Sequence, residues 1–293
     1  MIPPGHEPSG FSPSPSGLPV GAKVAVALES SFLGFFAHAG FINSLLDSGI
    51  RPAKVSGSSS GALVAAAYAC GLENERLKEF VLDRKLQRAF REWGTPLRCA
   101  AVFAAYCGHG IIGGKRAVKH LRRSLPVDKI ENTPNAELAI GVTNVSRRER
   151  QLIRQGDLAA FIVASCAAAP VISSQKIDGE FYLDGGFTDG APFEQWIDDD
   201  QIDTIILHRI VKDSAMDRRW NRATNIISCW HTMHHLVTEE LTDTRLKRAE
   251  AAGKKVIVHE TKTRAAGLIV SKQHSITNYQ TAYDTWKNSP SLR

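Results

Sequence analysis

Cysteine is scarce in this sequence, and its spacing excludes the usual cysteine-based sites. The 293 residues include five cysteines, an odd number, and no Cys-x-x-Cys pair occurs among them. Zinc sites and thiol–disulfide exchange depend on such paired spacing. We therefore expect buried, reduced thiols in a cytoplasmic protein, and no metal site.

Long apolar runs are also missing. No stretch of the sequence approaches the roughly 20 uninterrupted apolar residues that cross a bilayer. The first residues lack the charged region followed by an apolar region that marks a secretion signal. We expect neither export nor a membrane span, so that any contact with a membrane is peripheral.

Acidic residues are outnumbered by basic ones, with 30 Asp and Glu against 36 Lys and Arg. The formal net charge is +6 and the pI is near 9.1, which favours anionic partners. Aromatic residues do not interleave with the basic clusters as they do on base-stacking surfaces. We therefore expect no nucleic-acid partner, whereas peripheral contact with an anionic membrane remains open.

The chain divides into a leader and one domain. Residues 1–21 contain six prolines among glycine and serine, a composition that predicts disorder. From residue 22 to residue 293, strand-like and helical segments alternate, which predicts an α/β fold with a mainly parallel sheet. Strands are expected at residues 23–28, 52–56, 138–142, 202–207 and 255–258, and helices at 35–47, 62–70, 73–91 and 115–125.

Residues 57–61, Gly-Ser-Ser-Ser-Gly, fit the G-x-S-x-G motif between a predicted strand and a predicted helix. In a nucleophile elbow, Gly57 and Gly61 would allow the tight turn that exposes the Ser59 hydroxyl at the end of the sheet. The helix that follows would direct its N-terminal amides toward an oxyanion, so the Ser60 amide is the first expected donor. Taken alone, the five residues fit equally well a serine-rich turn without chemistry.

A serine hydroxyl needs a base, and Asp184 is the strongest candidate. It ends the apolar run at residues 181–183 and precedes Gly185 and Gly186, as at the mouth of a loop that approaches a ligand closely. The alternative is an Asp-Gly turn that closes a hairpin.

Together these motifs resemble the pattern of the patatin-like phospholipases. That pattern combines G-x-S-x-G, an A-S-x-A-x-P segment and D-G-G, which correspond here to residues 57–61, 164–170 with three alanines before the proline, and 184–186. The resemblance covers residues 24 to about 193. It implies a three-layer patatin-like fold, no cofactor, and a dyad without histidine in which Asp184 accepts the Ser59 proton. The implied substrates are lipid esters, cleaved as by a phospholipase A or a lysophospholipase through an acyl-enzyme.

One segment departs from the family pattern. Members usually carry a G-G-G-x-[KR]-G loop whose amides complete the oxyanion hole, and here its glycines fall on Ser30, Ser31 and Phe32, while the basic position falls on Gly34. The three non-glycine residues keep their backbone amide donors. Their side chains, however, crowd a ligand that approaches closely and disfavour a positive φ at these positions. Loss of one donor costs roughly 10²- to 10³-fold in rate. A non-catalytic lipid- or acyl-binding homologue is therefore one alternative, and an acyltransferase is another.

Two further patterns indicate other ligands less strongly. Residues 108–113 match G-x-G-x-x-G, but Glu131, the acidic residue about 20 positions on, lies in a loop-like segment rather than at a strand end, which disfavours a dinucleotide site. His231, His234 and His235 share a helical face, but no carboxylate completes a metal motif there.

A conventional triad is the rival mechanism, because Ser59, Asp184 and His208 follow the chain order of an α/β-hydrolase. Only about two strands fit between the start of the domain and Ser59, however, which is too few for that fold. His38, in the first predicted helix, is expected either to pack or to orient the loop that precedes it.

Overall fold

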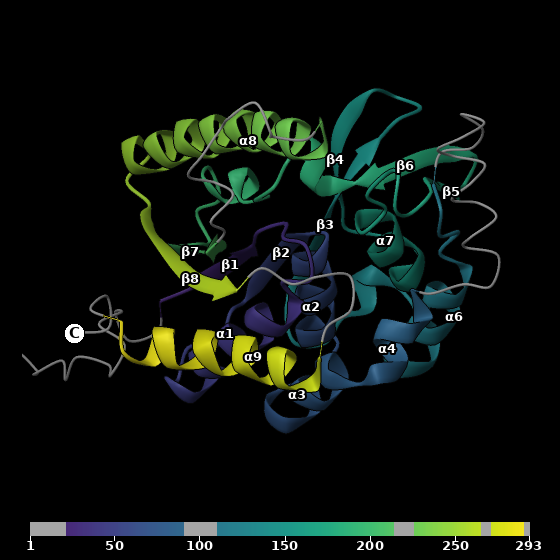
Figure 1. The fold of residues 1–293 in the computed structure, drawn as a ribbon. Coiled ribbons are helices and arrows are strands. Elements are labelled where there is room, and N and C mark those ends of the chain that lie inside the picture. Colours follow the sequence, from purple (N-terminus) through teal and green to yellow (C-terminus); the bar gives the residue numbers. More distant parts are fainter. Residues whose placement is uncertain (1–21, 91–109, 214–225, 265–270, 290–293) are drawn as a thin grey trace, which may run out of the picture.

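The computed structural model describes residues 22–90, 110–213, 226–264 and 271–289, without the side chains of residues 212–213, 226–236 and 264 (Figure 1). The predicted leader at residues 1–21, the first two residues of the G-x-G-x-x-G match, and the three clustered histidine side chains lie outside the described part.

One eight-stranded sheet forms the centre of the described structure. Its order is β5-β6-β3-β2-β1-β7-β8, and β4 pairs with β3 outside this path. Neighbours from β3 to β8 pair in parallel, whereas β4, β5 and β6 join antiparallel at the β3 side. The predicted mostly parallel α/β sheet is therefore confirmed. The strands are β1 Val24–Leu28, β2 Lys54–Ser58, β3 Glu137–Asn144, β4 Glu149–Ile153, β5 Gln175–Ile177, β6 Glu180–Asp184, β7 Thr204–Asp213 and β8 Lys255–Arg264.

Helices cover both faces of this sheet, which gives three layers (Figure 1). Strand β1 shows why, because all five of its residues are buried and alternate between two hydrophobic clusters. Val24, Val26 and Leu28 pack into one cluster, and Ala25 and Ala27 pack into the other. A strand buried on both faces reads as a continuous apolar run, as this one does.

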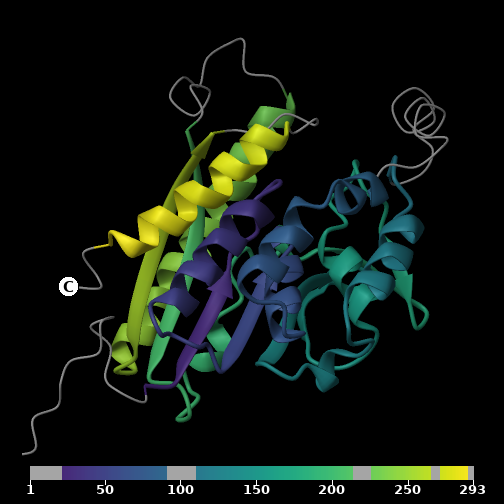
Figure 2. The same ribbon diagram turned by 90° about the horizontal axis from the view of Figure 1, so that it is seen from below.

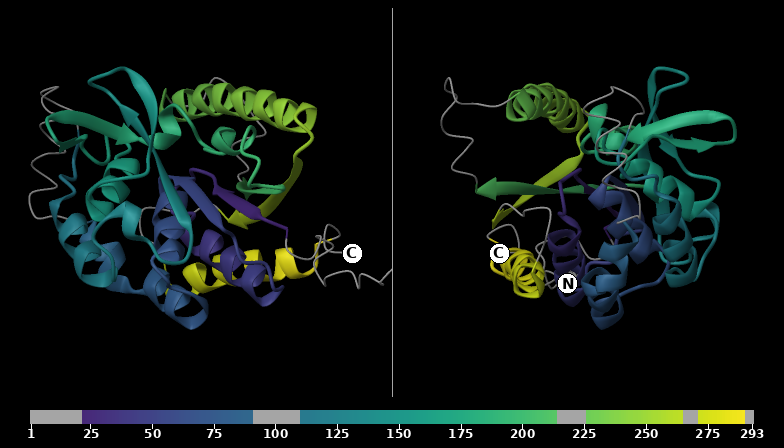
Figure 3. Two further views of the ribbon diagram at one scale, coloured as in Figure 1. Left: turned by 180° about the vertical axis from the view of Figure 1, so that it is seen from behind. Right: turned by 45° about the vertical axis from the view of Figure 1, so that its right-hand side comes forward.

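The first cluster holds α1, α2 and most of the shorter helices, and α9 lies beside α1 on this face (Figure 2). The second cluster holds α8, which runs across the opposite face (Figure 3). The helices are α1 Phe35–Asp47, α2 Ser60–Ala69, α3 Asn74–Leu82, α4 Arg84–Ala89, α6 Lys115–Ser124, α7 Leu158–Ser165, α8 Ile226–Ala251 and α9 Lys272–Lys287, with short 3₁₀ turns η1 Ile130–Asn132, η2 Gly185–Phe187 and η3 Glu194–Trp196.

Element boundaries differ from the sequence expectation at two informative places. The predicted helix at 73–91 breaks into α3 and α4, because Asp83 is extended and its side chain accepts a hydrogen bond from the Lys85 amide as the N-cap of α4. Strand β2 continues to Ser58 and α2 begins at Ser60, so a single residue, Ser59, joins strand to helix. No helix in the described ranges is both long and apolar enough to cross a membrane.

Candidate active site

The candidate site lies at the edge of the sheet where β1, β2 and β6 end. Parallel pairing aligns the end of β1 with that of β2, with Leu28 opposite Gly57. In β3, Gly141 lies opposite Ser58 of β2, and the next residue lies opposite Asp184 of β6. The register therefore brings Ser59 and Asp184 to one edge although 125 positions of sequence separate them.

Ser59 adopts the backbone geometry of a nucleophile elbow. Its φ of 54° and ψ of −122° lie in a region that non-glycine residues rarely occupy. The turn is closed tightly: a Cβ atom on Gly57 would lie 2.3 Å from the carbonyl carbon of Gly61, and one on Gly61 would lie 2.1 Å from the Leu28 oxygen. Only glycine fits at both positions. Such strain persists where the surrounding structure fixes it, and often at functional sites.

Ser165 and Gly141 help to fix this turn, and the sequence argument gave neither of them a role. The fully buried Ser165 hydroxyl accepts a hydrogen bond from the Ser59 amide at 2.9 Å and donates one to the Gly141 carbonyl at 2.6 Å. A Cβ atom on Gly141 would lie 2.3 Å from Ser58 Oγ, and one on Gly185 would lie 2.2 Å from the Gly141 oxygen. A glycine inside a predicted strand, which signals close backbone approach, was the available clue.

Asp184 is buried, with 5% of its surface exposed. Its side chain accepts a hydrogen bond from the Gly186 amide at 2.8 Å, and the Ser59 side chain lies close enough to lower its pKa. Burial raises the pKa of Asp184 to about 7, against the opposing effect of the Ser59 side chain and the Gly186 amide. A carboxylate with a pKa near neutrality, close to a hydroxyl, has the properties of a general base.

Cys166 completes the immediate surroundings of Ser59. Burial, followed by the nearby Asp184, raises the pKa of its thiol far above the usual range, against the opposing effect of the Ser59 side chain. The thiol is therefore neutral, and a neutral thiol is a poor nucleophile.

The loop between β1 and α1 carries the other predicted oxyanion residues. The Ser30 amide donates to the Gly190 carbonyl at 2.7 Å, so this amide already has an acceptor. Ser31 lies against Gly34, and Phe32 is 47% exposed, so its ring does not fill a closed pocket. The Ser60 amide lies in the first turn of α2, where backbone donors have no partner within the helix.

His208 does not complete a triad. One of its ring nitrogens lies 2.8 Å from His38 Nδ1 and the other lies 2.9 Å from Thr261 Oγ1. The second ring nitrogen of His38 lies 2.8 Å from the Glu29 carbonyl oxygen. Burial lowers the pKa of His38 to about 3 and that of His208 well below its ordinary value, so both rings are neutral. Through these contacts the two rings link the start of the loop between β1 and α1 to strands β7 and β8.

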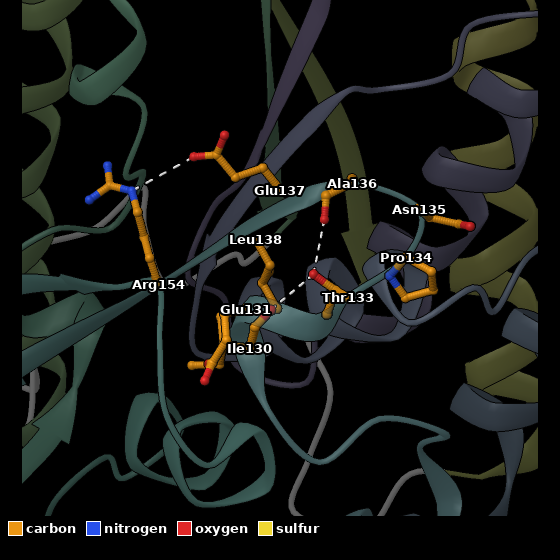
Figure 4. A pocket seen from close by; sticks show the side chains of 9 residues that line it. All are labelled: Ile130, Glu131, Thr133, Pro134, Asn135, Ala136, Glu137, Leu138 and Arg154. Atoms are coloured by element: carbon orange, nitrogen blue, oxygen red, sulfur yellow. Dashed lines mark hydrogen bonds and ion pairs between the residues drawn. The ribbon is translucent and has the colours of Figure 1, made fainter.

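A separate pocket of about 350 Å³ lies where β3 begins, at the opposite edge of the sheet (Figure 4). Glu131 lines it, and its carboxylate accepts a hydrogen bond from the Gly156 amide at 2.8 Å. Glu131 belongs to the 3₁₀ turn η1, whereas a dinucleotide site requires its acidic residue at the end of a strand. Among the described residues, no group of three or more His, Cys, Asp or Glu side chains is arranged to hold a metal ion.

A three-layer α/β sheet with an elbow serine beside a buried aspartate is the arrangement that the motif resemblance predicts. Residues 26–197 match the sequence profile of the patatin-like phospholipases, and the chain belongs to this family.

The chain is also similar in sequence to curated relatives and in fold to a solved structure. The chain is 31% identical over 186 residues to uncharacterized NTE family proteins of Mycobacterium bovis and Mycobacterium tuberculosis. These matches cover 61% of this chain and 48% of each relative, so the chain spans about half the length of the curated relatives it matches. Its fold is similar to that of VipD from Legionella pneumophila, with a TM-score of 0.51 at 14% identity over 90% of this chain and 66% of VipD.

Proposed function

We propose that this chain hydrolyses the carboxylic esters of lipids, with Ser59 as nucleophile and Asp184 as base. The observation that carries the proposal is the proximity of the two. Ser59 is held at positive φ in a strand-to-helix turn, and its side chain lies close to a buried carboxyl group whose pKa is about 7. Family membership supports the same chemistry.

In the proposed reaction, Ser59 Oγ attacks the acyl carbonyl carbon while Asp184 takes the hydroxyl proton. Negative charge then develops on the carbonyl oxygen, where the Ser60 amide and the N-terminus of α2 stabilise it. Collapse of this intermediate expels the alcohol, which recovers the proton from Asp184. Water then attacks the acyl-enzyme, with Asp184 again as the base, and releases the fatty acid. No step requires a cofactor.

The substrates we propose are acyl glycerolipids, cleaved as by a phospholipase A or a lysophospholipase. The net charge of +6 suits anionic headgroups and peripheral contact with an anionic membrane.

Intact-mass labelling with a fluorophosphonate tests the nucleophile without presuming a substrate. We expect one adduct on the wild type, none on Ser59→Ala, and far slower labelling of Asp184→Asn, because the amide cannot accept the proton. Ser124→Ala is the matched control, since its hydroxyl lies in α6 near His120. A wild type without an adduct contradicts the proposal and favours a non-catalytic acyl-binding protein.

A second measurement defines the substrate class. Fatty acid release is compared between vesicles of diacyl phospholipid, with and without anionic headgroups, and micelles of lysophospholipid. Added alcohols distinguish transfer from hydrolysis, because an acyltransferase would form the alkyl ester in preference to the free acid.

A further inference from the structure

The helices α4 and α6 concentrate the positive charge of the chain. Three of the six residues of α4 and five of the ten residues of α6 are Lys or Arg, and neither helix contains an acidic residue. Because the formal net charge of the whole chain is +6, the residues outside these two helices together carry −2. The basic residues of Arg84–Ala89 and Lys115–Ser124 are called the α4–α6 basic surface below.

In α6 the basic residues occupy the face that is turned away from the core. Ala117 and Leu121 are fully buried. At roughly 100° per residue, the other side of the helix carries five exposed basic residues within a single arc. They are Lys115, Arg116, Lys119, Arg122 and Arg123.

The basic residues of α4 adjoin this face. The two helices lie side by side, and their buried sides belong to the same hydrophobic cluster (Figure 1). All three basic residues of α4 are exposed. Burial lowers the pKa of His120 in α6, and the charges of Lys85 in α4 and Arg123 in α6 lower it further, against the effect of Asp83. Basic residues of both helices thus act on one ring, so the two sets form a continuous surface.

Two acidic residues border the surface, and both already have partners. Asp83 accepts a hydrogen bond from the Lys85 amide as the N-cap of α4. Asp157 accepts one from the Ala160 amide at 2.8 Å as the N-cap of α7, and it also forms an ion pair with Arg122. Two carboxylates do not neutralise eight basic side chains, so the surface keeps a large positive charge.

Helix stability does not explain this charge. Lys115 and Arg116 lie in the first turn of α6, where the helix dipole disfavours positive charge, and no acidic residue lies in that turn. An anionic partner outside the chain would account for basic residues at such positions.

The surface lies close to the edge of the sheet that carries Ser59, because α6 runs antiparallel to α7. A Cβ atom on Gly114, the N-cap of α6, would lie 2.9 Å from Val163 near the end of α7. Arg122, near the end of α6, pairs with the N-cap of α7. The first turn of α6 therefore lies beside the end of α7, where Ser165 binds the Ser59 amide.

We infer that the α4–α6 basic surface binds the headgroups of an anionic lipid bilayer. The inference rests on the proposed action on membrane lipids, and it names the surface by which the chain reaches them. Neither helix contains Phe, Tyr or Trp, so the surface offers neither aromatic anchors for insertion nor rings for base stacking. Binding is therefore electrostatic adsorption, which salt weakens. The net charge of −2 on the remaining residues favours one orientation of the chain on the bilayer.

Co-sedimentation with vesicles tests the surface without hydrolysis if the chain carries Ser59→Ala. We expect binding to vesicles of phosphatidylcholine with phosphatidylserine, weakened by added salt, and no binding to phosphatidylcholine alone. Each basic residue at an anionic membrane contributes about fivefold to affinity, so reversing three charges on α6 should raise the dissociation constant by roughly 100-fold or more. The reversed residues are Lys115→Glu, Arg116→Glu and Lys119→Glu.

A matched triple variant controls for net charge. It reverses three exposed lysines on α8, β8 and α9, and we expect it to bind nearly as well as the parent chain. These substitutions are Lys247→Glu, Lys255→Glu and Lys272→Glu. Glutamate in the first turn of α6 suits the helix dipole, so the melting temperature of the α6 variant should not fall. Equal loss of binding in the two variants overturns the inference, as does equal binding to both kinds of vesicle.

Two further measurements separate this inference from its alternatives. Fluorescence anisotropy with duplex DNA at the same salt concentration tests nucleic acid as the partner, and binding tighter than to anionic vesicles overturns the inference. With Ser59 intact, the α6 variant should keep its turnover of a soluble short-chain ester and lose hydrolysis of anionic vesicles. Fluorophosphonate labelling tests the hydrolase proposal by itself. A labelled wild type whose Ser59→Ala form ignores anionic vesicles removes this inference alone, whereas an unlabelled chain that binds them removes only the hydrolase.

Discussion

The hydroxyl of Ser165 accepts a hydrogen bond from the backbone amide of Ser59 at 2.9 Å. Ser165 is the last residue of α7, and it also binds the Gly141 carbonyl of β3. One buried side chain thus ties the turn that carries Ser59 to a helix and a strand more than 80 residues away. Ser59 pays a conformational cost at φ 54°, and this contact is one that holds it there.

Replacing Ser165 by alanine should impair both folding and activity. The change leaves the Ser59 amide and the Gly141 carbonyl without their partner in a dry environment, which costs about 1–3 kcal/mol in unfolding free energy. A displaced Ser59 should also lower kcat, by roughly 10- to 100-fold. Urea unfolding and esterase assays measure the two effects. A variant with wild-type kcat would show that Ser165 does not position the nucleophile.

Gly141→Ala tests the close approach of β3 and β2. The added methyl group would lie 2.3 Å from Ser58 Oγ, and we expect a loss of about 1–3 kcal/mol in unfolding free energy. Gly190→Ala is the matched control for stability, because the nearest atom to its added Cβ is 4.0 Å away on Thr238. Equal stability of the two variants in chemical denaturation would contradict the packing argument.

The activity should depend on pH through Asp184. The base must be ionised to accept the Ser59 proton, and burial raises its pKa to about 7. We therefore expect kcat/KM for an uncharged ester to rise with pH through about 7 and to reach a plateau above it. An acidic limb centred near pH 4 would show that Asp184 is not the group that titrates.

The same buried carboxyl group should lower the stability of the folded protein as pH rises. Its pKa is about 7 in the folded state and near 3.8 when unfolded, so between these values the folded state holds a proton that the unfolded state has lost. The unfolding free energy of the wild type should fall across this window relative to Asp184→Asn, by up to roughly 4 kcal/mol. Denaturant titrations at pH 5 and pH 8 cover the upper part of this window, where a fall of roughly 3 kcal/mol is expected. A difference that does not grow with pH contradicts the raised pKa.

His208→Asn distinguishes the dyad from a triad. Because the His208 ring nitrogens contact His38 and Thr261, we expect Ser59 to remain labelled by a fluorophosphonate and kcat to fall by less than about tenfold. Loss of a histidine that served as the base would cost roughly 10⁴-fold or more. Thr261→Val is the companion variant, since it removes the other hydrogen bond of the same ring. If a folded His208→Asn variant is no longer labelled while Thr261→Val still is, His208 serves as the base and the mechanism is a triad.

Local structure around Ser59 could be predicted from the sequence because its determinants are neighbours in the chain. The apolar run at residues 24–28, the helix at 35–47 and the glycines two positions either side of Ser59 each act over a few residues. Strand β2 and helix α2 nevertheless differ from the prediction by two residues, because the turn between them is a single residue long.

The amino-acid sequence alone thus determined the family, the α/β class and the identity of the candidate serine and aspartate, since motifs and short-range periodicity carry that information. The tertiary structure decided which groups surround them. The pairing of Val142 with Asp184, the burial that raises the Asp184 pKa, the Ser165 anchor and the occupied Ser30 amide all depend on contacts between segments distant in the chain. Hydrogen bonds and desolvation arise only when the packed sheet brings those segments together, so no local pattern encodes them.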